Sequence, residues 1–204
     1  MEYPKSIENL IKQFSSLPTV GRKTAERYVF HLLKQKPNQI KLFSKYLIEI
    51  IDGFAFCQNC LSPSEKNPCE ICSDIKRRDD LICLVANFQD LLAIENTKLY
   101  NGKYFILGGL INSVEETGPE NLNIKQLVKE INSKLKRNQK IEVILALSPT
   151  MEGESTSLYL QNLLKNSKIK ITKLARGLST GISLEYADEN TLANALKFRG
   201  IIQN

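Results

Sequence analysis

The 204-residue chain contains no tryptophan, a single histidine and no long apolar run. The missing apolar run excludes a bilayer-spanning helix, which needs roughly 20 consecutive apolar residues. The first residues, Met1 to Ser6, contain no apolar signal core, so we expect a cytoplasmic protein without a membrane partner. The lone His31 has no cysteine or carboxylate paired with it in the sequence, and we expect it to be packed or hydrogen-bonded rather than catalytic.

Two signals for nucleotide chemistry are also missing. No GxxxxGK[ST] phosphate loop occurs. Without tryptophan or an aromatic cluster, the sequence predicts no platform that stacks nucleobases. The net charge of +6 suits an anionic partner such as nucleic acid, but a basic balance alone is weak evidence. Two basic clusters fit a solvated face as well as an anion-binding face. They are Lys134, Lys136, Arg137 and Lys140, and then Lys165, Lys168, Lys170, Lys173 and Arg176.

Four of the five cysteines form two CxxC pairs, Cys57 with Cys60 and Cys69 with Cys72, with eight residues between the pairs. Four thiolates at this spacing can surround one Zn²⁺ in a tetrahedron, and they leave no open position for water. We therefore predict one structural zinc ion rather than a catalytic one. Two disulfides or a redox CxxC are the alternatives, and a reducing cytoplasm disfavours both. The fifth, Cys83, lies in an apolar run and is expected in the core.

Hydrophobic periodicity divides the chain into three segments and a tail, which predicts a multidomain α+β protein. Residues 1–53 are predicted to form helices, residues 54–78 to form a metal-held knuckle, and residues 79–176 to form an α/β domain, with a tail over 177–204. In the α/β segment, apolar strands alternate with helices, a pattern typical of a parallel sheet covered on both faces. The expected strands are 81–85, 104–107, 141–147 and 169–174, and the expected helices are 90–95, 124–135, 155–164 and, in the tail, 189–197.

The turn between the first two helices, Leu17 to Ala25, resembles the helix-hairpin-helix element of DNA-binding proteins. In that element, free N–H groups at a helix start and nearby cations hold a phosphate, so binding is independent of sequence. Gly21, Arg22 and Lys23 fit this role, and Arg27 follows Lys23 on the same helix face. The element normally has a glycine where this chain has Thr19, and a β-branched residue resists positive φ. We therefore expect an altered turn, and an ordinary corner of two helices is the alternative.

The α/β segment resembles a Toprim domain, whose catalytic members hold Mg²⁺ with a glutamate and an Asp-x-Asp pair at strand ends. The corresponding positions here are Ala86, Ser148 and Thr150, none of which is a carboxylate. Phosphoryl chemistry of that kind is therefore not expected. Three carboxylates remain near the strand ends, where helix capping or a partner contact is favoured over weak Mg²⁺ binding. They are Asp90, Glu152 and Glu154.

The order of hairpin, Cys₄ knuckle, Toprim-like segment and tail resembles the RecR family of bacterial recombination proteins over essentially the whole chain. The stretches that carry the resemblance are Leu17–Leu33, the four cysteines, Leu107–Gly109, Gly118–Glu120, Pro149–Glu154, Leu174–Leu178 and Leu184–Asp188. The resemblance implies a non-enzymatic mediator of recombinational gap repair, associated with the nucleoid when bound to DNA. It implies a clamp-like dimer or tetramer ring that acts with RecO and RecF to promote RecA loading.

Carried over by motif, Lys23 and Arg27 are the expected DNA contacts, with Gly21 and Arg22 as additions, and Glu152 and Glu154 are candidates for the RecO face. Family members usually have acidic residues where this chain has Ala86-Asn87, and Gly-Gly followed by an acid where it has Gly181-Ile182-Ser183.

Two other functions are compatible with the motifs: a Mg²⁺-dependent Toprim nuclease or primase-like enzyme, and a zinc-ribbon adaptor that does not bind nucleic acid. In the mediator hypothesis, the Cys₄ knuckle would fix the angle between hairpin and α/β domains, because a ring closes only when its contacts are presented at a set angle.

Overall fold

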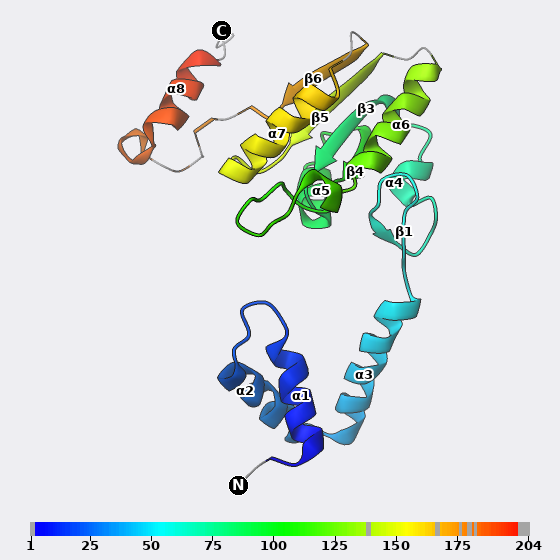
Figure 1. Cartoon of the computed structure of the whole chain (residues 1–204), viewed down its shortest axis with the longest axis vertical. Helices are drawn as coiled ribbons and strands as arrows, with labels where there is room; N and C mark the ends of the chain where they lie inside the picture. Colours follow the sequence, from blue (N-terminus) through cyan, green and yellow to red (C-terminus); the bar gives the residue numbers. More distant parts are fainter. Residues whose placement is uncertain are drawn as a thin grey trace. The chain divides into compact units, whose positions relative to one another are not determined.

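The computed structural model describes residues 3–137, 140–165, 168–175, 177–178, 181 and 183–199. The chain forms two compact units, which span residues 1–54 and 55–204 (Figure 1). None of the described helices combines the length and apolar content that a bilayer span requires.

Three helices make up the first unit: α1 (Lys5–Ser15), α2 (Arg22–Leu33) and α3 (Pro37–Asp52). All three were expected from the apolar period, and Pro37 begins α3 at its first turn, where a missing N–H costs nothing. Helices α1 and α2 pack through Ile11, Ala25 and Val29, which are all but completely buried. The unit therefore has a small core that holds its first two helices together.

The second unit is built on a four-stranded sheet with the order β4-β3-β5-β6, in which every neighbouring pair is parallel. Its strands are β3 (Arg78–Val85), β4 (Gly102–Ile106), β5 (Ile141–Ala146) and β6 (Ile169–Lys173). The parallel sheet that strand–helix alternation predicted is thus confirmed.

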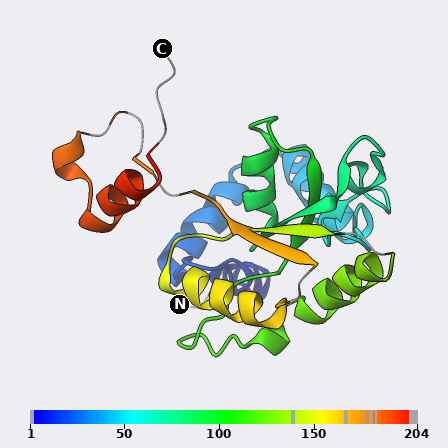
Figure 2. The ribbon, with the colours of Figure 1, turned by 90° about the horizontal axis from the view of Figure 1, so that it is seen from above.

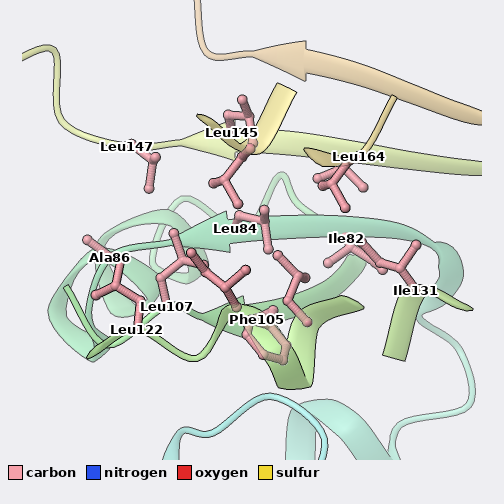
Figure 3. Close-up of a cluster of buried hydrophobic side chains, with 14 of the residues drawn as sticks. Ile82, Leu84, Ala86, Phe105, Leu107, Leu122, Ile131, Leu145, Leu147 and Leu164 are labelled. Carbon is pink, nitrogen blue, oxygen red and sulfur yellow. The ribbon is translucent and has the colours of Figure 1, made fainter. Parts of the chain in front are cut away.

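Helices cover both faces of this sheet (Figure 2). Helices α6 (Ile124–Lys136) and α7 (Met151–Leu163) pack on one face, and α5 (Phe88–Glu95) packs on the other. Alternate residues of β3 pack into the hydrophobic clusters on the two faces of the sheet, as the two-residue period of a strand requires. Leu84 lies in the larger cluster, with Phe105 and Leu145 opposite it on the neighbouring strands (Figure 3).

Helix α7 begins earlier than the sequence suggested, at Met151 rather than at residue 155. Thr150 is its N-cap, and its hydroxyl accepts the N–H of Gly153 at 3.3 Å. Glycine usually destabilises a helix, but Gly153 is needed in α7 for packing. A Cβ at this position would lie 1.9 Å from the carbonyl oxygen of Ser148, so only glycine lets the helix approach the end of β5 this closely.

The knuckle belongs to the same compact unit as the sheet. It comprises the short antiparallel pair β1 (Ala55–Phe56) and β2 (Pro63–Ser64), followed by α4 (Glu70–Ser73). At its other end the chain has a short turn of 3₁₀ helix and then α8 (Glu189–Lys197), which Asp188 caps by accepting the N–H of Thr191 at 2.9 Å. The helix predicted for the tail is confirmed.

Where the chain leaves the knuckle for the sheet, Arg77 holds it against α5. Its guanidinium binds the carboxylate of Glu95 with two N–H donors, and the hydroxyl of Tyr104 donates to the same carboxylate at 2.8 Å. Burial alone would raise the pKa of Glu95, but the hydrogen bonds from Arg77 and Tyr104 outweigh it and hold this pKa below its usual value. The ionised carboxylate therefore stabilises the fold.

We predict that Glu95→Gln lowers stability near neutral pH and that its effect fades in acid. Because the folded-state pKa of Glu95 lies below the unfolded one, its stabilisation is present above the unfolded pKa and disappears as the pH falls through the folded pKa. Urea denaturation of both proteins across this pH range measures the difference. Glu115→Gln in an exposed loop is the control, and a difference that stays constant with pH would contradict the assignment.

Candidate metal centre and nucleic-acid interface

The four knuckle cysteines come together as one group. Their Sγ atoms all lie within 4.8 Å of one another, and Cys60 and Cys69 are 3.5 Å apart. Tetrahedral Zn²⁺ with bonds of about 2.3 Å would separate its sulfurs by about 3.8 Å. Three of the four cysteines are buried, and Cys72 is half-buried. The residues therefore fit a closed four-sulfur metal site, and all five cysteines of the chain are free thiols rather than disulfides.

Hydrogen bonds prepare these sulfurs to carry negative charge. The N–H groups of Cys69 and Cys72 donate to the Sγ atoms of Cys57 and Cys69, both at 3.4 Å, and the buried hydroxyl of Ser62 lies 3.1 Å from Cys60 Sγ. The hydrogen bonds from Cys72 and then Ser62 lower the pKa of Cys60 to about 5, whereas the bond to Cys60 and burial raise the pKa of Cys72. Four adjacent thiols resist ionising together unless a cation joins them, which is the role that Zn²⁺ fills.

A lysine on the sheet fastens the knuckle in place. The ammonium of Lys103, on β4, donates to the carbonyl oxygens of Ile71, Cys72 and Asp74 at 3.0, 3.0 and 2.8 Å. Three residues further along β4, the N–H of Ile106 donates to the carbonyl oxygen of Cys60 at 3.0 Å. The three N–H donors of the Lys103 ammonium thus meet three carbonyl acceptors. One of these carbonyls belongs to Cys72, so Lys103 fixes the backbone of a member of the sulfur cluster. Sequence reasoning missed this residue because Lys103 lies about thirty positions from its acceptors.

We predict that Lys103→Met loosens the metal site. Three charge-assisted hydrogen bonds are lost and three carbonyls are left without their donor, which we expect to cost about 2–3 kcal/mol of stability. After loading with Zn²⁺, the variant should release the ion to a chelator several-fold faster than the parent protein. Lys129→Met, an exposed lysine on α6, is the matched control. Equal release rates in parent and variant would show that the ammonium does not position the site.

The hairpin turn is the second candidate site. Thr19 adopts φ of +66°, the left-handed conformation that glycine would supply and that a β-branched residue resists, so threonine takes this conformation in spite of its preference. The N–H of Val20 closes the turn on the carbonyl oxygen of Leu17 at 3.1 Å. Gly21 is the N-cap of α2, no side chain caps this helix, and no atom lies within 4 Å of where its Cβ would be. The start of α2 is therefore open to an anion.

The strained threonine gives a direct test of the turn. We predict that Thr19→Gly stabilises the helical unit by about 0.5–1 kcal/mol, because relief of a left-handed β-branched residue exceeds the entropy that glycine loses on folding. Thr24→Gly, inside α2, removes the same side chain at a helical position and should destabilise instead. Chemical denaturation monitored by helical circular dichroism measures both. Destabilisation by the Thr19 variant would contradict the turn geometry.

The cations near the turn have two different environments. Arg22 binds both carboxylate oxygens of Glu8 on α1, at 2.9 and 3.0 Å, and also pairs with Glu26 at 3.3 Å. Lys23 and Arg27 are exposed, and among the described residues neither takes part in an ion pair. Arg22 therefore joins the two helices, whereas Lys23 and Arg27 present their charge to solvent.

The helical unit is also the more basic part of the chain. Residues 1–54 contain nine Lys and Arg against five Asp and Glu, so they carry +4 of the net +6. The unit also contains two aromatic pairs that the sequence did not reveal. Tyr3 meets Phe30 edge-on with ring centroids 5.6 Å apart, and Phe14 meets Tyr28 in the same way at 5.8 Å. The sequence signal was weak because these residues are spread over three separate stretches.

His31 is exposed, and its Nε2 lies 2.9 Å from the side-chain nitrogen of Gln35 one turn along α2. The prediction of a hydrogen-bonded histidine is confirmed.

At the carboxyl end of β3, residues next to the Toprim-like position Ala86 cap a helix. Ala86 is buried at the end of β3, and the next residue, Asn87, caps α5 by accepting the N–H of Asp90 at 2.9 Å. Asp90 accepts the N–H of Asn87 in return, at 3.3 Å. The capping role favoured for Asp90 is therefore confirmed.

The two glutamates beside this edge are placed differently. The hydrogen bond from Thr150 lowers the pKa of Glu152, whereas Glu154 accepts two bonds from the ammonium of Lys173, both at 2.7 Å. Among the described residues, the four cysteines are the only group of at least three Cys, His, Asp or Glu side chains close enough to share an ion. Asp90, Glu152 and Glu154 are not brought together in that way.

Comparison with known proteins finds family matches for three stretches of the chain. Residues 7–51 match the family "RecR, helix-hairpin-helix", residues 80–175 match the Toprim domain, and residues 177–199 match "RecR, C-terminal". The chain is 41% identical over 199 residues to "Recombination protein RecR" from Staphylococcus aureus strains MRSA252 and Newman, and each match covers 98% of both chains. The chain belongs to the RecR family. A role in recombination and DNA repair follows from this membership, and the hairpin of a RecR protein is the part expected to meet DNA.

Proposed function

We propose that the protein is a non-enzymatic RecR-type mediator, which binds DNA without reading its sequence and acts in recombinational gap repair. The observation that carries the proposal is the hairpin, where Lys23 and Arg27 are exposed beside the uncapped start of α2. Open N–H groups and exposed cations suit a phosphate backbone, which is the same at every base pair. Arg22 is a weaker candidate because its guanidinium already binds Glu8, and Gly21 contributes by leaving room at the helix start.

The mediator role is favoured over a Toprim enzyme by the residues at the strand ends. Ala86, Ser148 and Thr150 stand where catalytic members would have carboxylates, and none can ligate Mg²⁺ as a carboxylate does. Thr150 is also occupied, since it caps α7. The neighbouring Glu152 is exposed to partners at its partly open position, and Glu154 presents its carboxylate together with the Lys173 ammonium that binds it. We propose both glutamates as part of the face that meets RecO.

Assembly into a clamp is supported by α3. Its apolar side chains are unusually exposed for a helix: Ile48 is 58% exposed and Ile51 is 78% exposed. A contiguous row of this kind marks a protein interface rather than a solvated surface. We propose that α3 is buried when chains of this protein assemble into a dimer or ring that acts with RecO and RecF to promote RecA loading.

We further propose that the metal is one structural Zn²⁺ per chain. The Cys₄ set leaves no open coordination position, so the ion would order the knuckle rather than take part in chemistry. The knuckle is hydrogen-bonded to β4, and in the sequence it follows α3. An ordered knuckle would therefore fix the course of the chain where it joins the sheet.

We expect the protein to be associated with the nucleoid when it is bound to DNA.

The proposal predicts that the double variant Lys23→Glu, Arg27→Glu loses at least tenfold in DNA affinity at low salt. Removing two phosphate contacts should also reduce the slope of log affinity against log salt by about 1.8. Fluorescence anisotropy with a labelled duplex measures both quantities. The double variant Lys125→Glu, Lys129→Glu makes the same charge change on exposed positions of α6 and should bind nearly as well as the parent.

Three control measurements keep the result unambiguous. Circular dichroism and metal content establish that the hairpin variant is folded, and solution mass should exceed the 23.1 kDa of one chain. Unchanged affinity in the hairpin variant would overturn the DNA-contact assignment. Mg²⁺-dependent cleavage or primer synthesis that disappears in Glu152→Gln would favour the enzyme, and a parent protein without affinity for DNA at low salt would favour the adaptor.

A further inference from the structure

A hollow on the exposed side of α2 combines cations with aromatic rings. It has a volume of about 550 Å³ and is lined by Arg27, Tyr28, Phe30, His31 and Lys34. This volume falls within the range of roughly 300–1,000 Å³ that is typical of clefts for small molecules. The lining residues belong to α2 and its C-cap, Lys34, and α2 begins at the hairpin turn (Figure 1). The hollow therefore lies on the same helix as Lys23.

The cations of this surface form a stripe. Lys23, Arg27 and Lys34 are spaced by four and seven residues, and eleven residues complete about three helical turns, so the three side chains lie on one face of α2. At a rise of about 1.5 Å per residue the stripe is about 16 Å long, enough to follow several phosphates of one strand. Phosphate contacts alone would not require aromatic neighbours.

The rings of the hollow are held in place but remain partly open. Phe30 is 38% exposed and Tyr28 is 46% exposed, although each also packs edge-on against a second aromatic ring, Tyr3 and Phe14 respectively. His31 is steadied by Gln35. Rings that are fixed at the edge and partly exposed can accept a nucleobase without losing much side-chain freedom.

We propose that this hollow binds an unpaired nucleobase of single-stranded DNA, while Arg27 and Lys34 hold the phosphates on either side of it. This inference rests on the proposed function, because it assumes that DNA follows α2. In a duplex the bases are stacked inside the helix, out of reach of rings on a protein surface, whereas an unpaired base can stack on them. The hollow would therefore favour a single strand, or the unpaired side of a junction, over duplex alone.

The test compares a labelled single-stranded oligothymidine with a duplex of the same length, both by anisotropy at one salt concentration. Phe30→Leu keeps an apolar side chain against Tyr3 but removes the aromatic face. It should weaken single-strand binding about fivefold or more and change duplex binding less than twofold, since stacking on one base contributes about 1–3 kcal/mol. Phe30→Tyr should retain the parent affinity for both probes.

Lys34→Gln tests the phosphate contact separately. It should reduce the salt slope for the single strand by about 0.7, the value for one phosphate contact on a single strand. Tyr159→Leu and Lys129→Gln are the matched controls, because Tyr159 on α7 is 36% exposed and Lys129 is exposed on α6. Both controls should leave both affinities unchanged.

Several outcomes would overturn the inference. Equal loss on single strand and duplex in Phe30→Leu, or no loss on either, would show that the hollow does not take an unpaired base. A changed solution mass in Phe30→Leu, with unchanged affinity for DNA, would show that it is instead covered by a second copy of the chain. Failure of the proposed function is distinguishable, because the parent protein would then bind neither probe at low salt.

A photocrosslinking experiment on the parent protein does not depend on the fold of a variant. A single strand that carries 4-thiothymidine should form adducts on the peptide that contains Phe30 and His31. Adducts found only on other peptides would overturn the inference.

Discussion

The attachment of the knuckle to β4 is the constraint on which the second unit depends. An edge strand of a parallel sheet has unpaired N–H and C=O groups that must be covered or solvated. On β4 the N–H of Ile106 donates to the carbonyl oxygen of Cys60, and the ammonium of Lys103 donates to carbonyl oxygens at the end of α4. The knuckle thus covers the edge of the sheet, and the sheet supplies the only lysine that holds the backbone of a sulfur ligand among the described residues.

This mutual dependence explains why so polar a segment can be ordered. The knuckle's own buried cluster consists of cysteines and one partly buried isoleucine, which is too small a core to offset the entropy of ordering its chain. The Lys103 ammonium supplies part of the missing stabilisation, and a metal bound to the four sulfurs would supply more. The same reasoning connects the metal to the sheet, because a knuckle that opens would expose the edge of β4. Metal, knuckle and sheet are therefore expected to fold together.

Much of this architecture was predictable from the sequence, because it follows from short-range patterns. Apolar periodicity identified the helices of the first unit and the four parallel strands, and the CxxC spacing identified the sulfur cluster. The features that escaped prediction depend on contacts between distant residues or on a local energy balance. Lys103 meets carbonyls about thirty residues away, and Thr19 keeps a strained φ because the hairpin's packing outweighs its preference. Each aromatic pair of the helical unit joins a residue of α2 to a distant one. Phe30 meets Tyr3, which precedes α1, and Tyr28 meets Phe14 on α1.

Helix caps occupy the Toprim-like edge of the sheet. Beyond the carboxyl end of β3, Asn87 and Asp90 cap α5, and beyond that of β5, Thr150 caps α7. These caps stabilise the fold whether or not any ligand is present, since each satisfies an N–H that the helix cannot bond itself. Because a fold does not determine an activity, function in this chain must be argued from its surfaces. The hairpin unit carries most of the net positive charge and has Lys23 and Arg27 exposed near the start of its second helix.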